Sequence, residues 1–118
     1  MNCPRCNMPM EGTYICPHCG YEDKVAKKII FASNRHYNEG LSRAKVRDLS
    51  GAAEALRTAL KYNKRNTQAR NLLGLIYYQM GEIVPGLSEW VISLHFQEHA
   101  NPAKEYIQTV QDNPQELA

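Results

Sequence analysis

Residues 73–90 read LGLIYYQMGEIVPGLSEW, and this stretch decides the fold. Apolar residues recur in it at three- and four-residue spacing on both sides of Gly81, as expected of two amphipathic helices. Glycine is the residue type that most often ends a helix in a left-handed cap. Pro85 is tolerated because it falls in the first turn of the second helix. The stretch therefore predicts two helices joined by a tight turn.

The same pattern occurs 34 residues earlier in the chain. With that shift, Gly40-Leu41 aligns with Gly74-Leu75, and Leu56 aligns with Trp90. A glycine on the first helix lets two helix backbones approach closely, and small residues on the second leave room for the bulky side chains. The chain thus contains an internal repeat with a period typical of helical solenoids.

Two such units, at about residues 33–66 and 67–100, resemble the tetratricopeptide repeat. The second unit carries the resemblance through Leu73-Gly74, Tyr77-Tyr78, Gly81, Ile83, Gly86 and Trp90. The first unit departs from the family pattern at Arg43, in place of an aromatic residue, and at Arg47, in place of the turn glycine. The resemblance implies an all-α helical-repeat fold of about five helices. We expect them at 23–46, 50–62, 67–80, 84–99 and 102–111, with Ser50 and Asn101 as N-caps.

Two repeats are fewer than the three that such arrays usually need. Three explanations stay open: the first helix and the last helix (about 102–111) cap the array, the protein self-associates, or the chain is one piece of a longer repeat protein.

The resemblance also implies a partner-binding surface. In this family the first helix of each unit lines a concave surface that holds a partner's peptide or helix. The positions that map onto it here are Asn34, Tyr37, Leu41, Ala44, Lys45, Gln68, Asn71, Leu75, Tyr78 and Gln79. Aromatic area with amide neighbours suits an extended segment. The alternative is that Tyr37, Leu41 and Tyr78 belong to the core between helices.

All four cysteines lie before the repeats, in Cys3-Pro4-Arg5-Cys6 and Cys16-Pro17-His18-Cys19-Gly20. Four sulfur ligands at this spacing suit one tetrahedral Zn²⁺, with two disulfides or a redox iron as the alternatives. Four thiolates leave no open coordination position, so we expect a structural zinc that supplies the folding energy of this small unit. His18 is expected to be exposed rather than a ligand.

This segment resembles a zinc ribbon of the rubredoxin-knuckle type, and the resemblance covers residues 1–20. The nine residues between the two cysteine pairs are enough for a short hairpin with Gly12 near its tip. We therefore divide the chain into a zinc ribbon at 1–22 and a helical-repeat domain at 23–118.

Charge is distributed unevenly along the chain. The formal net charge is +2, but residues 24–80 hold twelve Lys or Arg against three acids, whereas residues 81–118 hold one Lys against six acids. The basic band of residues 24–80 is either a set of solvated helix faces or a surface for an acidic protein, an anionic surface, RNA or the acidic end of a second copy.

The segment His95-Phe96-Gln97-Glu98-His99 matches a zinc-protease pattern, H-x-x-E-H. We reject that interpretation because the match ends a repeat helix and only 19 residues follow it, too few for a distant third ligand. No other catalytic motif occurs, and no apolar stretch is long enough to span a bilayer.

The sequence therefore predicts a cytoplasmic, non-enzymatic scaffold that binds a protein or peptide partner, or a second copy of itself, and carries one structural zinc. A nucleic-acid-associated adaptor that uses the basic band is the alternative. A redox or iron protein is the third hypothesis.

Overall fold

The computed structural model describes residues 2–10 and 13–112. Within that part, the helices in chain order are α1 (Lys24–Lys45), α2 (Leu49–Tyr62), α3 (Thr67–Gln79), α4 (Ile83–Phe96) and α5 (Ala103–Asp112). The described residues form no strand, only two isolated antiparallel bridges that flank the cysteines. The predicted all-α fold with a cysteine cluster at the N-terminus is confirmed.

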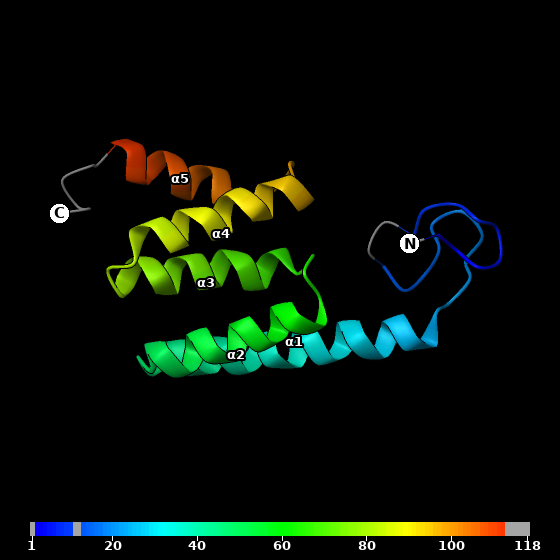
Figure 1. Ribbon diagram of the computed structural model, residues 1–118, viewed down its shortest axis with the longest axis horizontal. Helices are drawn as coiled ribbons and strands as arrows, with labels where there is room; N and C mark the ends of the chain where they lie inside the picture. The colour runs from blue at the N-terminus through cyan, green and yellow to red at the C-terminus, as the bar shows by residue number, and fades with distance from the viewer. Residues whose placement is uncertain (1, 11–12, 113–118) are drawn as a thin grey trace.

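Each helix packs mainly against its neighbours in the sequence, and the five form a row that ends with α5 (Figure 1). The molecule is elongated, with extents of 52 × 27 × 17 Å. The N-terminal part of α1 projects beyond the other helices and connects them to the cysteine cluster (Figure 1). The fold therefore has a helical body and a small N-terminal unit at the end of a single helix.

One packing contact occurs twice, 34 residues apart. A Cβ placed on Gly40 of α1 would lie 2.7 Å from Cγ of Leu56 on α2, and a Cβ on Gly74 of α3 would lie 2.6 Å from Cδ1 of Trp90 on α4. In both pairs the missing side chain lets a bulky residue pack against the helix backbone. The glycines expected to permit close approach do so, and the internal repeat has a structural counterpart.

The main core lies between α1, α2 and α3. Its members are small or aliphatic and buried, namely Ala52, Ala53, Leu56, Ala59, Ala69, Leu73 and Ile76. A second cluster lies between α4 and α5, where Trp90 packs with Ala103 and Val110. Full burial of a large apolar side chain stabilises the fold by about 1.5–3 kcal/mol. The α5 helix thus covers the outer side of Trp90, as expected of a capping helix.

A buried polar link joins the two repeat units. Asn66 precedes α3 and accepts a hydrogen bond from the Ala69 N–H with its Oδ1, at 3.1 Å. Its Nδ2 donates to Ser33 Oγ at 2.9 Å, and Ser33 in turn donates to the Ala59 carbonyl at 2.7 Å. One side chain therefore caps α3 and fixes its start against α1.

The expected cap of the second helix was wrong. Asp48 caps α2 by accepting a hydrogen bond from the Gly51 N–H at 3.1 Å, whereas Ser50 lies inside the first turn. The helix starts one residue earlier than expected because an Asp at this spacing reaches an orphan N–H of the first turn. Just before it, Arg47 adopts φ +65°, the left-handed conformation that Gly81 adopts at the equivalent turn of unit two with φ +83°.

The other helix limits agree with the predicted ones to within one residue, except the end of α4. This helix ends at Phe96 rather than near 99. Side chains of the loop that follows it bind carbonyl groups of the same loop, and these bonds compete with helical ones. Gln97 Nε2 donates to the carbonyls of His99 and Ala100, and Asn101 Nδ2 donates to the Gln97 carbonyl. The helix therefore cannot continue through residues 97–100.

Candidate metal centre and binding groove

The four cysteine sulfur atoms lie within 4.8 Å of one another. Sγ of Cys3 is 3.6 Å from Sγ of Cys19, and Sγ of Cys6 is 3.5 Å from Sγ of Cys16. A tetrahedron with metal–sulfur bonds of about 2.3 Å has edges of about 3.8 Å. The donor set and its spacing therefore fit one metal ion that is bound by four thiolates.

Two equivalent turns bring the sulfur atoms together. In the first, the Asn7 N–H donates to the Cys3 carbonyl at 2.8 Å, and in the second the Gly20 N–H donates to the Cys16 carbonyl at 2.9 Å. Both donors have positive φ, 64° and 78° respectively. Gly20 adopts this conformation without steric cost because it has no Cβ, and asparagine is among the residue types that adopt it more often than others. The expected hairpin tip at Gly12 lies outside the described residues.

The backbone and the sulfur atoms divide the thiols into two kinds. Burial opposes ionisation of Cys16, but the N–H groups of Cys19 and His18 and the neighbouring thiols outweigh it and lower its pKa to about 6. The Met8 N–H favours the Cys6 thiolate, yet burial and the other three sulfur atoms raise the pKa of Cys6 to about 12. The four thiols are therefore unequal, and Cys16 ionises more readily than Cys6.

A set of side chains attaches the cysteine cluster to α1. The rings of Tyr14 and Phe31 meet edge to face with centroids 5.7 Å apart. Lys27 forms an ion pair with Glu22 at 3.0 Å, and its ammonium lies 5.6 Å from the centroid of each ring. Asp23 caps α1 by accepting from the Val25 and Ala26 N–H groups. The metal unit is therefore fixed to the first two turns of α1.

A pocket of about 370 Å³ lies on the side of the body formed by α1, α3 and the loop that leads into α5. It collects four of the residues expected to bind a partner, Tyr37, Gln68, Asn71 and Leu75. The loop and α5 complete it with Gln97, Asn101 and Tyr106, which the sequence interpretation did not include. Of these three residues, the sequence drew attention to Asn101, but it was interpreted only as the N-cap that starts the last helix.

The remaining expected groove residues lie elsewhere. Asn34 Oδ1 accepts from Asn66 Nδ2 at 3.3 Å, and Tyr78 is half-buried against the Trp90 ring, with centroids 6.4 Å apart. Leu41 is half-buried, while Lys45 and Gln79 are exposed, and none of the three lines the pocket. The pocket is thus smaller than the expected surface and is shifted towards α5.

Asn71 holds a buried acceptor in this pocket. Its Nδ2 donates to Asn101 Oδ1 at 2.8 Å. Asn101 cannot turn around, because its Oδ1 also accepts from the Ala103 N–H and its Nδ2 donates to Ser93 Oγ. Asn71 Oδ1 is therefore left buried with no hydrogen-bond partner in the described part of the chain. Such an atom costs about 1–3 kcal/mol, and a ligand N–H would remove that cost.

No family model, curated protein or solved structure matches this chain. The geometry of the two sites is therefore the basis for a proposal on function.

The zinc-protease pattern at residues 95–99 does not form the helical face that its spacing requires. Because α4 ends at Phe96, His99 lies beyond the helix. Among the described residues, the group of His, Cys, Asp and Glu side chains close enough to hold a metal is the cysteine cluster. No described helix combines the length and the apolar character that crossing a membrane requires.

Proposed function

We propose that this chain is a non-enzymatic scaffold, a tetratricopeptide-like repeat that holds an extended segment of a partner protein and carries a structural zinc ribbon. The pocket carries the proposal, and the buried, unpaired Oδ1 of Asn71 in its lining is an acceptor that a main-chain N–H would satisfy when the segment displaces the side chains over it. Leu75 and the rings of Tyr37 and Tyr106 line the same pocket and provide apolar area for a side chain of that segment.

Zinc is the metal that the cluster favours. Four thiolates in tetrahedral spacing with buried Cys3 and Cys16 form a closed set, which leaves no position for a substrate. The ion would hold both turns together and would supply no reaction chemistry. Its role is to fold the unit that α1 carries.

The scaffold role can be tested by selection from a random peptide library displayed on phage, with the zinc-loaded chain as bait. We expect to select peptides that bind the wild type. Their affinity for Leu75→Glu should be at least about tenfold lower, because a charge replaces an apolar side chain that lines the pocket. Gln79→Glu adds the same charge outside the pocket and is the matched control.

The acceptor is tested on a selected peptide by methylating one backbone nitrogen at a time. We expect one position at which methylation weakens binding about tenfold, the effect of losing one hydrogen bond to a buried group. Peptides that bind Leu75→Glu as tightly as the wild type would place the binding site elsewhere.

The nucleic-acid alternative has weaker support. Several cations of the basic band are already engaged within the chain, among them Arg43 with Glu39 and Asp48, and Arg70 with Glu89. Binding of single-stranded RNA with a steep dependence on salt would favour the alternative, and no binding at low salt would end it.

A further inference from the structure

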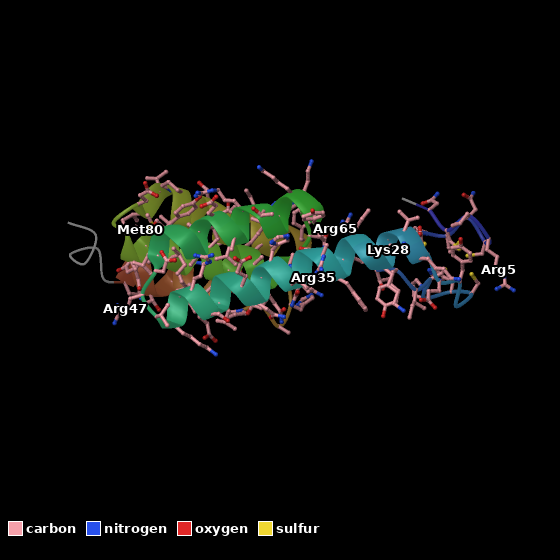
Figure 2. The ribbon with its side chains drawn as sticks, turned by 90° about the horizontal axis from the view of Figure 1, so that it is seen from below. Arg5, Lys28, Arg35, Arg47, Arg65 and Met80 are labelled. Atoms are coloured by element: carbon pink, nitrogen blue, oxygen red, sulfur yellow. The ribbon has the colours of Figure 1, made fainter. Side chains whose placement is uncertain are left out.

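The first two turns of α1 form an arm, residues 24–31, that no other helix covers (Figures 1 and 2). The body begins at Ser33, which is fully buried and bonded to α2. On the arm, by contrast, the side chains of Val25, Ile29 and Phe31 are 68%, 41% and 48% exposed. Single apolar side chains are common on protein surfaces, but three of them within two helical turns are an unusually high number.

The arm and the next turn border a hollow of about 660 Å³ with a basic rim. Phe31 and Ala32 contribute apolar surface to it, and the cations around it are Lys24, Lys27, Lys28 and Arg35. Figure 2 shows Lys28 and Arg35 on the part of α1 that leads to the cysteine cluster. Lys27 is paired with Glu22, so the other three cations are the ones available to an acidic partner. The hollow suits an apolar side chain with carboxylates nearby.

The α4 helix, which lies between α3 and α5 in the row, has an exposed apolar face. Val84, Val91 and Ile92 are 74%, 58% and 37% exposed, and with Leu87 and Ser88 they border a hollow of about 430 Å³. The helix has one formal charge, Glu89, and Arg70 of α3 pairs with it at 3.0 Å. A helix that is apolar on nearly all sides is normally covered by another element.

The segments of the chain that carry the two hollows differ in charge. The α1 helix holds six Lys or Arg against one Glu, whereas residues 82–112 hold one Lys against five acids. Glu82 immediately precedes α4, and Glu105 lies in the first turn of α5. Both are exposed. A basic hollow with one large apolar side chain, Phe31, and an uncharged apolar hollow on α4, which Glu82 precedes, therefore occur on different helices of the same chain, which favours a second copy as the occupant of each.

We propose that copies of this chain associate head to tail, with the outer face of α4 from one copy on the basic hollow of α1 from the next. Because the two surfaces differ, the contact is heterologous, and each dimer keeps one free surface at either end. The contact would bury Phe31 on one side and Val84, Val91 and Ile92 on the other, which is less than the about 1,200 Å² of a stable interface, so it is weak and sensitive to salt. This proposal is independent of the Asn71 pocket.

Sedimentation velocity of the zinc-loaded chain tests it. We expect the average mass to rise with concentration at about 0.05 M salt and to return towards the monomer at about 0.5 M salt, where exposed charges are screened. Lys24→Glu/Lys28→Glu, which reverses the charge of the hollow, and Val84→Gln/Val91→Gln, which removes apolar surface without adding a charge, should each raise the dissociation constant at least about tenfold. Lys45→Glu/Lys61→Glu, with the same change of charge outside the hollow, should associate like the wild type.

A mixture of the two defective variants decides the arrangement. The first retains an intact α4 face and the second an intact α1 hollow, so the mixture should form a one-to-one dimer that grows no further. Circular dichroism and thermal midpoints like those of the wild type show that the variants fold. Failure of the mixture to dimerise while both variants are folded would overturn the head-to-tail arrangement.

Two further outcomes would also overturn it. One is a wild-type chain that stays monomeric up to about 1 mM, which corresponds to less than about 4 kcal/mol of association free energy. The other is a monomer that binds polyglutamate through Lys24 and Lys28, which would assign the α1 hollow to an acidic partner instead.

Discussion

Gly74 and Trp90 lie so close together that no side chain fits between them. A Cβ on Gly74 would be 2.6 Å from Cδ1 and 2.8 Å from Cε2 of the indole ring. The ring cannot turn away freely, because its N–H donates to the Asn71 carbonyl at 3.1 Å and its other side packs on Tyr106, with centroids 5.4 Å apart. The pair therefore fixes the distance between α3 and α4.

Replacing Gly74 by alanine should destabilise the fold. Overpacking against a rigid ring costs about 1–3 kcal/mol, and the better helix propensity of alanine offsets about 1 kcal/mol of it. We expect a net loss of up to about 2 kcal/mol in the free energy of unfolding, measured by urea denaturation followed by circular dichroism. Gly40→Ala is the matched control, and its loss should be smaller because the Leu56 side chain in its way can change rotamer. Equal losses would contradict the role given to the indole.

Asn66 should be among the most sensitive polar positions. Asn66→Ala removes the cap of α3 and the donor to Ser33, and we expect a loss of about 2 kcal/mol. Asn66→Ser keeps a capping oxygen and loses only the link to α1, so its loss should be smaller. The same denaturation measurement checks both, and a neutral Asn66→Ala would show that the buried link contributes nothing.

Zinc binding should release fewer protons than the number of thiols. The lowered pKa of Cys16, about 6, means that this thiol is already ionised at neutral pH, whereas Cys6 with a pKa of about 12 must give up its proton to the solvent. Cys3 is shifted in the same direction as Cys16, and Cys19 in the same direction as Cys6. We expect fewer than the about three protons per zinc that four ordinary thiols, each with a pKa of about 8.5, would release at pH 8, and weaker binding as the pH falls. Calorimetry in buffers of different ionisation enthalpy measures this number, and a value of about three would mean that the thiols ionise independently.

Asp48 should make stability depend on acid pH. The Gly51 N–H and the Arg43 guanidinium lower the pKa of this carboxyl below its usual value, which the unfolded chain retains. Its stabilising contribution is therefore present above about pH 4 and is lost as the pH falls through the lowered pKa. Asp48→Asn keeps a capping oxygen but has no charge, so it should be less stable than the wild type at pH 7 and equal to it well below pH 4. Urea midpoints at both pH values measure this, and Glu54→Gln on the same helix is the control.

The positions of the helices and the grouping of the four cysteines follow from local sequence, and for that reason both could be predicted. Glycine and capping residues mark helix ends through backbone conformation, and paired cysteines bring sulfur atoms together wherever the turns fold. The misplaced cap shows the limit of this reasoning. Ser50 and Asp48 are both good caps, and only the hydrogen bond to Gly51 distinguishes them.

The lining of the pocket between α1, α3 and α5 was predicted only in part because it depends on the order in which helices stack. Tyr37, Gln68, Asn71 and Leu75 lie in it, as expected from the repeat, but Tyr106 enters from α5, outside both units. The spacing of residues along α1 and α3 does not indicate that an aromatic ring from α5 will lie beside them. The unpaired acceptor of Asn71 is equally hidden from sequence, since it arises from the orientation of Asn101.

The nearest-neighbour packing of the five helices has a consequence for how the chain folds during synthesis. Each helix finds its main partner in a helix adjacent to it in the sequence, so no element waits for a distant segment before it can bury its apolar face. Contacts that are local in sequence form quickly and need little loop closure. The α1–α2 pair can therefore form on the ribosome before α4 is made, and the growing chain exposes little more than one unpaired helix at a time.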